Sequence, residues 1–411
     1  MSAEHNVAPQ TRAMTAGYDA ASSLEAAVAP VYRTSTFIFP DCATGKRAFQ
    51  LAYGLDKAKE GEKQPMIYTR VGNPNSEILE KRIISWDKCA QDALLFSSGM
   101  GAISTSLLTF LKPGDELVFT DPVYGGTEFL LRKMLPSFGI TTYPIPAGCS
   151  EAELEALVAA HPKVKVVYVE SPANPVIRVT DIKAAARVAH GHKALLFVDN
   201  TFTGPVFCQP HTLGADVVVY SATKFIGGHS DVVAGIASGS FELIGQIRAT
   251  RTILGTINGP DEAWLLTRSL STLELRMRAQ EQNAIRIVEL LDSHPAVEKV
   301  FYPGHKSMGE EQVRIWKEQF SGHGSLITFL VKGGEAEAFK VLDNLKHVNL
   351  AVSLGGVESL IEHPATMTHA DMSPEELKEA GIVDNMIRMS VGLENIDDLL
   401  ADMKAALDLI A

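Results

Sequence analysis

The sequence predicts an α/β protein built around a doubly wound, mostly parallel β-sheet. Short runs that are apolar almost throughout recur between residues 92 and 221, as strands buried on both faces of a parallel sheet require. Amphipathic stretches of helical length separate most of these runs. Strands that alternate with helices in this way form a parallel sheet with helices on both faces.

Each element of this sheet is predicted from one segment. The apolar runs that predict strands are DALLF (92–96), DELVFTD (115–121), KVKVVYVESP (163–172), ALLFVDN (194–200) and ADVVVYS (215–221). The amphipathic stretches that predict helices are 101–111, 126–139, 150–161 and 181–191.

After about residue 270 the pattern becomes that of a smaller α+β domain. Amphipathic stretches predict helices at 276–294, 335–347 and 396–410, and apolar runs predict strands at 324–334 and 385–395. The predicted parts are an N-terminal arm and loop (1–66), an α/β domain (67–270) that holds the candidate site, and the C-terminal α+β domain (271–411).

The composition argues against several classes of protein. A net charge of −12 disfavours binding to nucleic acids or anionic membranes. No apolar run reaches the ~18–20 residues that span a bilayer, and the N-terminus lacks the apolar core of a signal peptide. The four cysteines form no CxxC pair, which favours free thiols and a cytoplasmic location. No histidine group has the spacing of a metal site, so we expect no metal.

Polar or small residues follow several predicted strands at their carboxyl ends. They form the segments SSGM (97–100), DPVYGG (121–126), ESPANP (170–175), DNTF (199–202) and SATK (221–224). Because ligands of such sheets collect at this edge, the convergence predicts the site there.

Lys224 carries the most specific chemistry at this edge. A lysine after a strand is most often a solvated charge, but Ser221 and Thr223 offer hydroxyls suited to a phosphate. Gly227 and Gly228 allow a close approach of backbone. A partly desolvated lysine amine is what an imine with pyridoxal 5′-phosphate (PLP) needs.

Three further residues fit the same interpretation. Asp199, at the end of its strand, is a helix cap, a metal ligand or a structural acceptor, or it keeps a pyridine nitrogen protonated. Tyr124 either packs or stacks on a ring and transfers a proton. Arg388 lies in an apolar strand, where it needs an anion: a structural carboxylate or the carboxylate of a substrate.

The glycine-bearing turn after the first strand supports two interpretations. The amides of Gly99 and Met100 at a helix N-terminus suit a phosphate. Gly99, Gly101 and Ser104 also approach the GxGxxG pattern of a nicotinamide-dependent oxidoreductase. That alternative lacks the third glycine and leaves Lys224 unexplained.

The motifs YTRVGNPN, SSGMGAI, YGGT, ESPANP, VDNTF, SATKFIGGHSDVVAG, SLGGVESLIEHPATMTH and IRMSVGLEN occur in that order. Together they resemble the PLP-dependent Cys/Met-metabolism (trans-sulfuration) enzymes. That family includes methionine γ-lyase, cystathionine γ-lyase, cystathionine γ-synthase and the O-acylhomoserine sulfhydrylases. The resemblance implies the aspartate-aminotransferase-like PLP fold (fold type I), and it spans about residues 27–411.

The resemblance implies a role for each matching position. Lys224 would bind PLP as an imine and move protons, with Asp199 on the ring nitrogen and Tyr124 on the ring face. The phosphate would lie against Ser98, Gly99, Met100, Ser221 and Thr223. Tyr68 and Arg70 would reach the cofactor of a neighbouring subunit, which implies a homodimer and commonly a dimer of dimers. The substrate carboxylate would meet Asn174, Ser353 and Arg388.

Two apolar positions favour one activity within the family. Relatives that act on cystathionine tend to have acids where this chain has Ile67 and Val352, so an apolar pair fits a thioether. This favours a methionine γ-lyase-like γ-elimination that gives 2-oxobutanoate, ammonia and a thiol. The resemblance also implies that Gly126 contacts the substrate, as Ile67 and Val352 do. Gly126 departs from the methionine γ-lyase pattern, because those enzymes usually have cysteine there.

Four alternatives stay open at this point. γ-Replacement by an O-acylhomoserine sulfhydrylase or cystathionine γ-synthase, and cystathionine γ-lyase activity, use the same cofactor. A nicotinamide-dependent oxidoreductase would bind NAD and show no visible absorbance, and a catalytically inactive scaffold protein would lack turnover.

Overall fold

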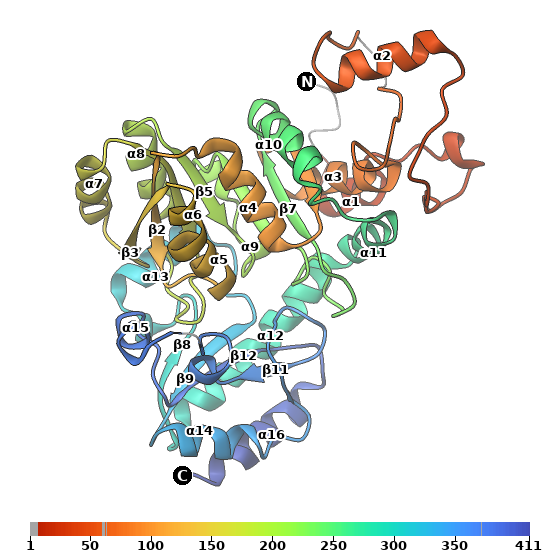
Figure 1. Ribbon diagram of the computed structural model, residues 1–411. Coiled ribbons are helices and arrows are strands. Elements are labelled where there is room, and N and C mark those ends of the chain that lie inside the picture. Colours follow the sequence, from red (N-terminus) through yellow and green to blue (C-terminus); the bar gives the residue numbers. More distant parts are fainter. Residues whose placement is uncertain (1–6, 60–61, 63, 371) are drawn as a thin grey trace.

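The computed structural model describes residues 7–59, 62, 64–370 and 372–411. Two β-sheets, each with its own helices, form the body of the molecule, and the N-terminal segment with α2 (Cys42–Ala52) extends away from it (Figure 1). The α/β class and the second, smaller sheet predicted from the sequence are confirmed.

The larger sheet has seven strands in the order β1-β7-β6-β5-β4-β2-β3. Their bounds are β1 Asp92–Phe96, β2 Glu116–Asp121, β3 Thr141–Pro146, β4 Val164–Glu170, β5 Leu195–Asp199, β6 Val217–Ser221 and β7 Gly235–Gly239. Strands β3, β2, β4, β5 and β6 are parallel, whereas β7 runs antiparallel between β6 and β1. The sheet is therefore mostly parallel, as predicted.

Both faces of this sheet are covered, which explains the almost uninterrupted apolar strands. Along β4, Val166 and Tyr168 belong to the core under α4 (Gly99–Phe110) and α10 (Phe241–Leu254). Val167 and Val169 belong to the core on the opposite face. That face is covered by α3 (Pro74–Trp86), α7 (Glu151–Ala160), α8 (Ile182–Gly191) and α11 (Pro260–Leu270). Successive side chains of a strand point to opposite faces of the sheet. Because both faces are covered here, both sets of side chains are buried, and the strand is apolar throughout instead of alternating between apolar and polar residues.

In the larger sheet, two strands and several helix boundaries were not predicted. β3 contains two prolines and lies at the edge of the sheet, where a missing N–H is tolerated. β7 consists of GIASG, whose small residues have weak strand propensity. The segment predicted as one helix at 126–139 contains α5 (Gly125–Phe129), a π-helical turn (Leu130–Met134) and α6 (Leu135–Ser137).

The smaller sheet has five strands in the order β10-β11-β12-β9-β8. Their bounds are β8 Val297–Phe301, β9 Leu326–Val331, β10 Asn349–Leu350, β11 Leu360–Glu362 and β12 Met386–Ser390. A core of its own lies between this sheet and α12 (Leu273–Ser293), α14 (Glu335–Leu342) and α16 (Ile396–Asp408). In this smaller sheet, β8, β10 and β11 were not predicted, and helix α14 ends earlier than the predicted 335–347. Helices α13 (Glu310–Gln319) and α15 (Pro374–Glu379) complete this part.

The predicted arm and loop contain helices that the sequence analysis missed. They are α1 (Pro9–Thr15) and α2, and residues 1–6, 60, 61 and 63 of this segment lie outside the described residues. Arg47 of α2 forms ion pairs with Asp56 and Glu62 and donates to the Lys57 carbonyl, so it fastens the following loop to the helix. Across the described residues, no helix is both long and apolar enough to cross a membrane.

Candidate active site

A cavity of about 280 Å³ lies at the carboxyl ends of the parallel strands. Most of its lining comes from the turns after β1, β2, β4, β5 and β6, and the remainder comes from the second part of the chain. The predicted residues that line it are Ser98, Gly99, Met100, Tyr124, Asn174, Asp199, Ser221, Thr223, Lys224, Val352, Ser353 and Arg388. Segments that lie far apart in the sequence therefore meet at the carboxyl ends of the strands, where the sequence analysis predicted the site.

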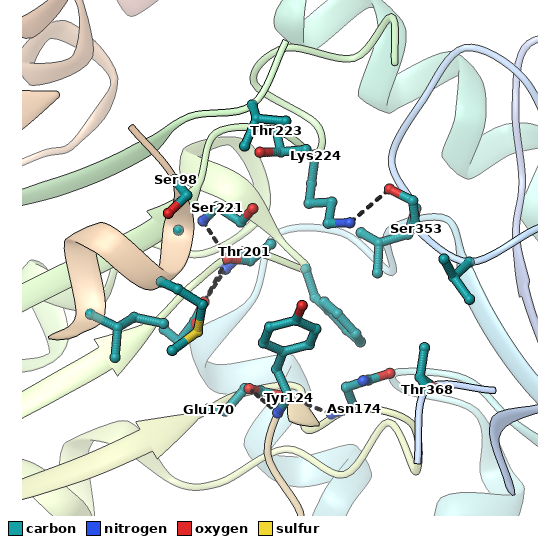
Figure 2. A pocket seen from close by; sticks show the side chains of 18 of the residues that line it. Ser98, Tyr124, Glu170, Asn174, Thr201, Ser221, Thr223, Lys224, Ser353 and Thr368 are labelled. Carbon is teal, nitrogen blue, oxygen red and sulfur yellow. Dashed lines mark hydrogen bonds between the residues drawn. The ribbon is translucent and has the colours of Figure 1, made fainter. Parts of the chain in front are cut away.

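Lys224 lies in the turn after β6 and points into this cavity (Figure 2). Its Nζ donates to Ser353 Oγ at 2.7 Å. Burial and then the charge of Arg388 lower the pKa of Lys224, Glu362 acts in the opposite direction, and the resulting pKa is about 8. The amine is therefore only partly protonated near neutral to mildly alkaline pH, as a nucleophilic lysine requires.

The glycine pair after Lys224 serves packing rather than ligand approach. Gly228 has φ +71°, and a Cβ there would lie 1.9 Å from Nη1 of Arg276. That guanidinium donates to the carbonyl of Phe225 at 2.8 Å. Gly228 thus allows the Arg276 side chain of α12 to fasten the lysine turn.

The start of α4 and the end of β6 form a compact pocket for an anion. Ser98 caps α4 by accepting from the Gly101 N–H at 2.9 Å, which leaves the amides of Gly99 and Met100 in the first turn. A Cβ on Gly99 would lie 2.9 Å from Cβ of Ser221, so only glycine allows this approach. The hydroxyl of Thr223 already exchanges hydrogen bonds with Ala234.

Asp199 is a buried carboxylate at the end of β5. It accepts from the Thr201 N–H (3.0 Å), the Thr201 hydroxyl (2.6 Å) and the Tyr168 hydroxyl (3.2 Å). Burial raises the pKa of Asp199, and these hydrogen bonds oppose that shift. Within the described part of the chain it forms no ion pair, so a cationic ligand atom beside it would be stabilised.

Tyr124 caps α5 and enters the cavity opposite Lys224 (Figure 2). Gly126, predicted to contact the substrate, does not line the cavity. It lies under the tyrosine: a Cβ there would lie 2.8 Å from Cε1 of Tyr124 and 3.1 Å from Sδ of Met100. Any larger residue at this position would have to displace the Tyr124 ring or Met100.

Arg388 has the first of the two partners that the sequence analysis considered, a structural carboxylate. Its neighbours Ile387 and Met389 on β12 face the helical core, so Arg388 points to the other face of the strand, where the cavity lies. Its guanidinium pairs with Glu362 (2.9 Å), its opposite residue on β11. It also donates to Asn174 Oδ1 (2.8 Å) and the Ser353 carbonyl (3.0 Å).

Ile67, Tyr68 and Arg70 do not line the cavity of their own chain. Tyr68 is 40% exposed, and Arg70 is exposed while donating to the carbonyl of Thr252 at 2.7 Å. Val352, predicted to act together with Ile67, is in the cavity wall.

The sequence analysis missed several residues of the site. These are Glu170, Thr201, Phe202, Val233, Glu362 and Thr368. Glu170 begins the quoted segment ESPANP, so its position at a strand end was a usable signal. Glu362 had only the signal of an acid within an apolar strand.

The donor set of this cavity fits PLP. Free helix amides at the start of α4 suit its phosphate, buried Asp199 lacks a cation that a protonated ring nitrogen would supply, and Lys224 offers an amine. No group of three metal-ligating side chains is found among residues 7–59, 62, 64–370 and 372–411.

The chain is similar to known proteins over nearly its whole length. Residues 10–408 match the model of a family described as Cys/Met metabolism PLP-dependent enzyme. An L-methionine gamma-lyase of Fusobacterium nucleatum subsp. nucleatum is 41% identical over 384 residues, 93% of each chain. A cystathionine beta-lyase of Lactococcus lactis subsp. cremoris is 40% identical over 97% of this chain and 98% of its own. Among solved structures, the cystathionine gamma synthase of Xanthomonas oryzae pv. oryzae in complex with cystathionine has a TM-score of 0.89, with 35% identity and 98% of each chain covered.

Proposed function

The chain belongs to the Cys/Met metabolism PLP-dependent enzymes, and on that premise we propose that it is a lyase that cleaves methionine- or homocysteine-like amino acids by γ-elimination. Its cofactor is pyridoxal 5′-phosphate. For L-methionine the reaction consumes one water and gives 2-oxobutanoate, ammonia and methanethiol.

One observation carries this choice: the described cavity lining has no uncommitted carboxyl group that could pair with the distal ammonium of cystathionine. The described cavity lining contains two carboxyl groups, Glu170 and Asp199. Both already accept hydrogen bonds, Glu170 from two backbone amides. Val352 and Val233 give part of the wall an apolar surface. A thioether can rest against such a wall, whereas the distal ammonium of cystathionine would lose its hydration there without compensation.

In this account the substrate carboxylate binds Arg388, in addition to the ion pair with Glu362, and Asn174 keeps the guanidinium turned toward the cavity. A bidentate contact between arginine and a carboxylate gives both orientation and affinity. The α-carbon of the substrate is thereby held within reach of Lys224.

The cofactor, when bound, supplies an electron sink for negative charge at the α-carbon. Lys224 removes the α-proton once its amine is free, and its lowered pKa suits it to accept and return protons near neutral pH. Asp199 stabilises the positive charge on the ring nitrogen. Tyr124 protonates the departing sulfur from the opposite side of the cavity.

We also propose that two chains complete each site. Ile67, Tyr68 and Arg70 do not line the cavity of their own chain, and Tyr68 and Arg70 are exposed, which supports their insertion into the site of a second copy. The assembly is then a homodimer, or two such dimers together.

γ-Replacement is the second candidate, because two observations favour it. Gly126 stands where methionine γ-lyases usually have cysteine, and the fold resembles that of a cystathionine gamma synthase. In this reaction a thiol, rather than water, would capture the activated carbon skeleton.

Product analysis separates the two candidates. Purified enzyme would be given methionine, homocysteine, cysteine, cystathionine and O-acylhomoserines, each with and without added thiol. γ-Elimination predicts 2-oxobutanoate from methionine without thiol. Turnover of O-acylhomoserines that depends on thiol and exceeds methionine cleavage would overturn the lyase assignment in favour of replacement.

A further inference from the structure

Glu170 is a buried carboxyl group in the cavity wall to which the preceding proposal gives no chemical step. It ends β4, is 4% exposed and lies beside Asp199, its partner in the parallel pairing of β4 with β5. Burying two neighbouring carboxyl groups is costly unless each has a task or a strong set of partners.

The two oxygens of Glu170 hold two separate loops. Oε2 accepts from the backbone N–H of Tyr124 at 2.9 Å, and Oε1 accepts from the backbone N–H of Asn174 at 2.8 Å (Figure 2). Tyr124 belongs to the turn between β2 and α5, whereas Asn174 belongs to the loop after β4. One side chain therefore joins the loop of the proposed ring-stacking tyrosine to the loop of the residue that orients Arg388.

We propose that Glu170 is a positioning residue that fixes the loops of Tyr124 and Asn174 relative to each other in the cavity wall. This inference rests on the proposed roles of these two residues but not on the choice of sulfur substrate. Its effect on Arg388 passes through Asn174, whose side-chain oxygen accepts from the guanidinium at 2.8 Å.

The electrostatic surroundings agree with a structural link rather than a freely titrating acid. Burial and then the charge of Asp199 raise the pKa of Glu170, whereas the two backbone amides and Arg388 lower it. Asp199 accepts three donors against two for Glu170, so the adjacent Asp199 is the better stabilised anion of the pair.

Only a side chain with two acceptor atoms at this length can make both contacts. Glu170→Gln keeps the shape, but its amide nitrogen is a donor and would face one of the two N–H groups. Glu170→Asp keeps both acceptors but is shorter, so it cannot reach both amides without moving a loop. The two variants thus damage the same link in different ways.

Asp402→Asn supplies a matched control. Asp402 is also buried and accepts from the backbone amides of Lys346, His347 and Val348, but it lies on α16 and does not line the cavity. Loss of its contacts should lower thermal stability without changing substrate binding.

The test measures binding of L-alanine to the PLP-loaded enzyme from the absorbance change of the bound cofactor. L-Alanine has the α-amine and α-carboxylate but no sulfur side chain, so this measurement does not depend on the proposed activity. We expect Glu170→Gln and Glu170→Asp to weaken L-alanine binding about tenfold or more, and Asp402→Asn to leave it unchanged. Equal L-alanine affinity in wild type and in a folded Glu170 variant would overturn the proposal.

A double-mutant cycle between Glu170→Gln and Asn174→Ala distinguishes positioning from general destabilisation. If Glu170 acts through Asn174, the double variant should bind L-alanine only slightly more weakly than Asn174→Ala alone. Additive losses would contradict the proposed link. If Glu170→Gln does not fold, Glu170→Asp is used in the same cycle. The proposed activity and the role of Glu170 can fail independently. If the wild type does not cleave methionine but the losses in L-alanine binding are non-additive, the lyase assignment is rejected and Glu170 remains a positioning residue.

Discussion

At the scale of single residues, Lys224 and Glu362 share one electrostatic environment, although Lys224 follows β6 of the larger sheet and Glu362 lies in β11 of the smaller one. The pKa of Lys224 is lowered to about 8 by burial and by Arg388, and the negative charge of Glu362 limits that decrease. A lysine with a lowered pKa is protonated below that value and neutral above it. The rate of covalent PLP attachment to the cofactor-free protein should therefore rise with pH and level off above about pH 8.

Removing the charge of Glu362 should shift this profile to lower pH. In Glu362→Gln the opposing influence is lost and Arg388 is no longer neutralised, so both changes lower the pKa of Lys224. The measurement is the pH midpoint of the attachment rate, followed by absorbance. Glu242→Gln, on the exposed start of α10, serves as control and should keep the wild-type midpoint. A midpoint that moves upward in Glu362→Gln would refute this electrostatic account.

Residue chemistry was predictable where it depended on sequence position alone. Lys224, Asp199 and Tyr124 follow strands, so the carboxyl-edge rule could bring them together. Glu362 could not be found in this way, because its importance comes from lying opposite Arg388 on a neighbouring strand. The glycines after Lys224 are visible in the sequence, but the side chain for which Gly228 makes room, Arg276, lies on α12 and could not be predicted.

At the scale of elements, the close approach of α4 to β6 creates the pocket that we propose for the cofactor phosphate. Gly99→Ala would place a methyl group 2.9 Å from Cβ of Ser221 and 3.1 Å from its Cα. Because backbone must move to relieve such a contact, we expect a loss of about 1–3 kcal/mol in the free energy of unfolding. PLP affinity should fall as well, since the helix amides move away from Ser221.

Gly245→Ala is the matched control for this prediction, because Gly245 lies within α10 and a Cβ there meets nothing within 4 Å. Alanine in an open helical position should stabilise the protein by about 0.5–1 kcal/mol. Urea unfolding of the cofactor-free proteins and titration with PLP would measure both quantities. Equal PLP affinity in Gly99→Ala and wild type would show that the helix start does not form the pocket.

The long apolar strands and many amphipathic helices could be predicted from periodicity, but β3 at one edge of the sheet and β7 between β6 and β1 could not. β3 and β7 have compositions that do not favour strands, and they pair because neighbours leave them open hydrogen-bonding edges. The bulky side chains of the neighbouring strands supply the burial that GIASG lacks.

At the scale of the whole molecule, the cavity forms only when both parts of the chain are folded together. Lys224 comes from the larger sheet, whereas Ser353 and Arg388 come from the smaller one. Sequence patterns could predict the two parts separately, but not the contact between them, because that contact depends on side chains that meet only after folding.

Subunit complementation tests whether a second copy completes each site. Arg70→Ala and Lys224→Ala should each be nearly inactive alone. In mixed dimers one of the two sites receives both intact residues, so random mixing should restore about a quarter of wild-type sites. Mixing Lys224→Ala with tagged wild type controls for exchange of chains. Exchange without recovery of activity would place Arg70 in the site of its own chain.

We propose that the cavity accepts a thioether and offers no partner to the distal ammonium and carboxylate of cystathionine. The most direct test is the ratio of kcat/KM for L-methionine to that for L-cystathionine, measured with wild-type holoenzyme in the absence of thiol. The wall at Val352 is apolar, and Glu170 and Asp199 already accept hydrogen bonds within the protein. We therefore expect the ratio of kcat/KM for methionine to that for cystathionine to be well above one, with 2-oxobutanoate as a product of methionine. A ratio below one would contradict the account and assign the enzyme to cystathionine.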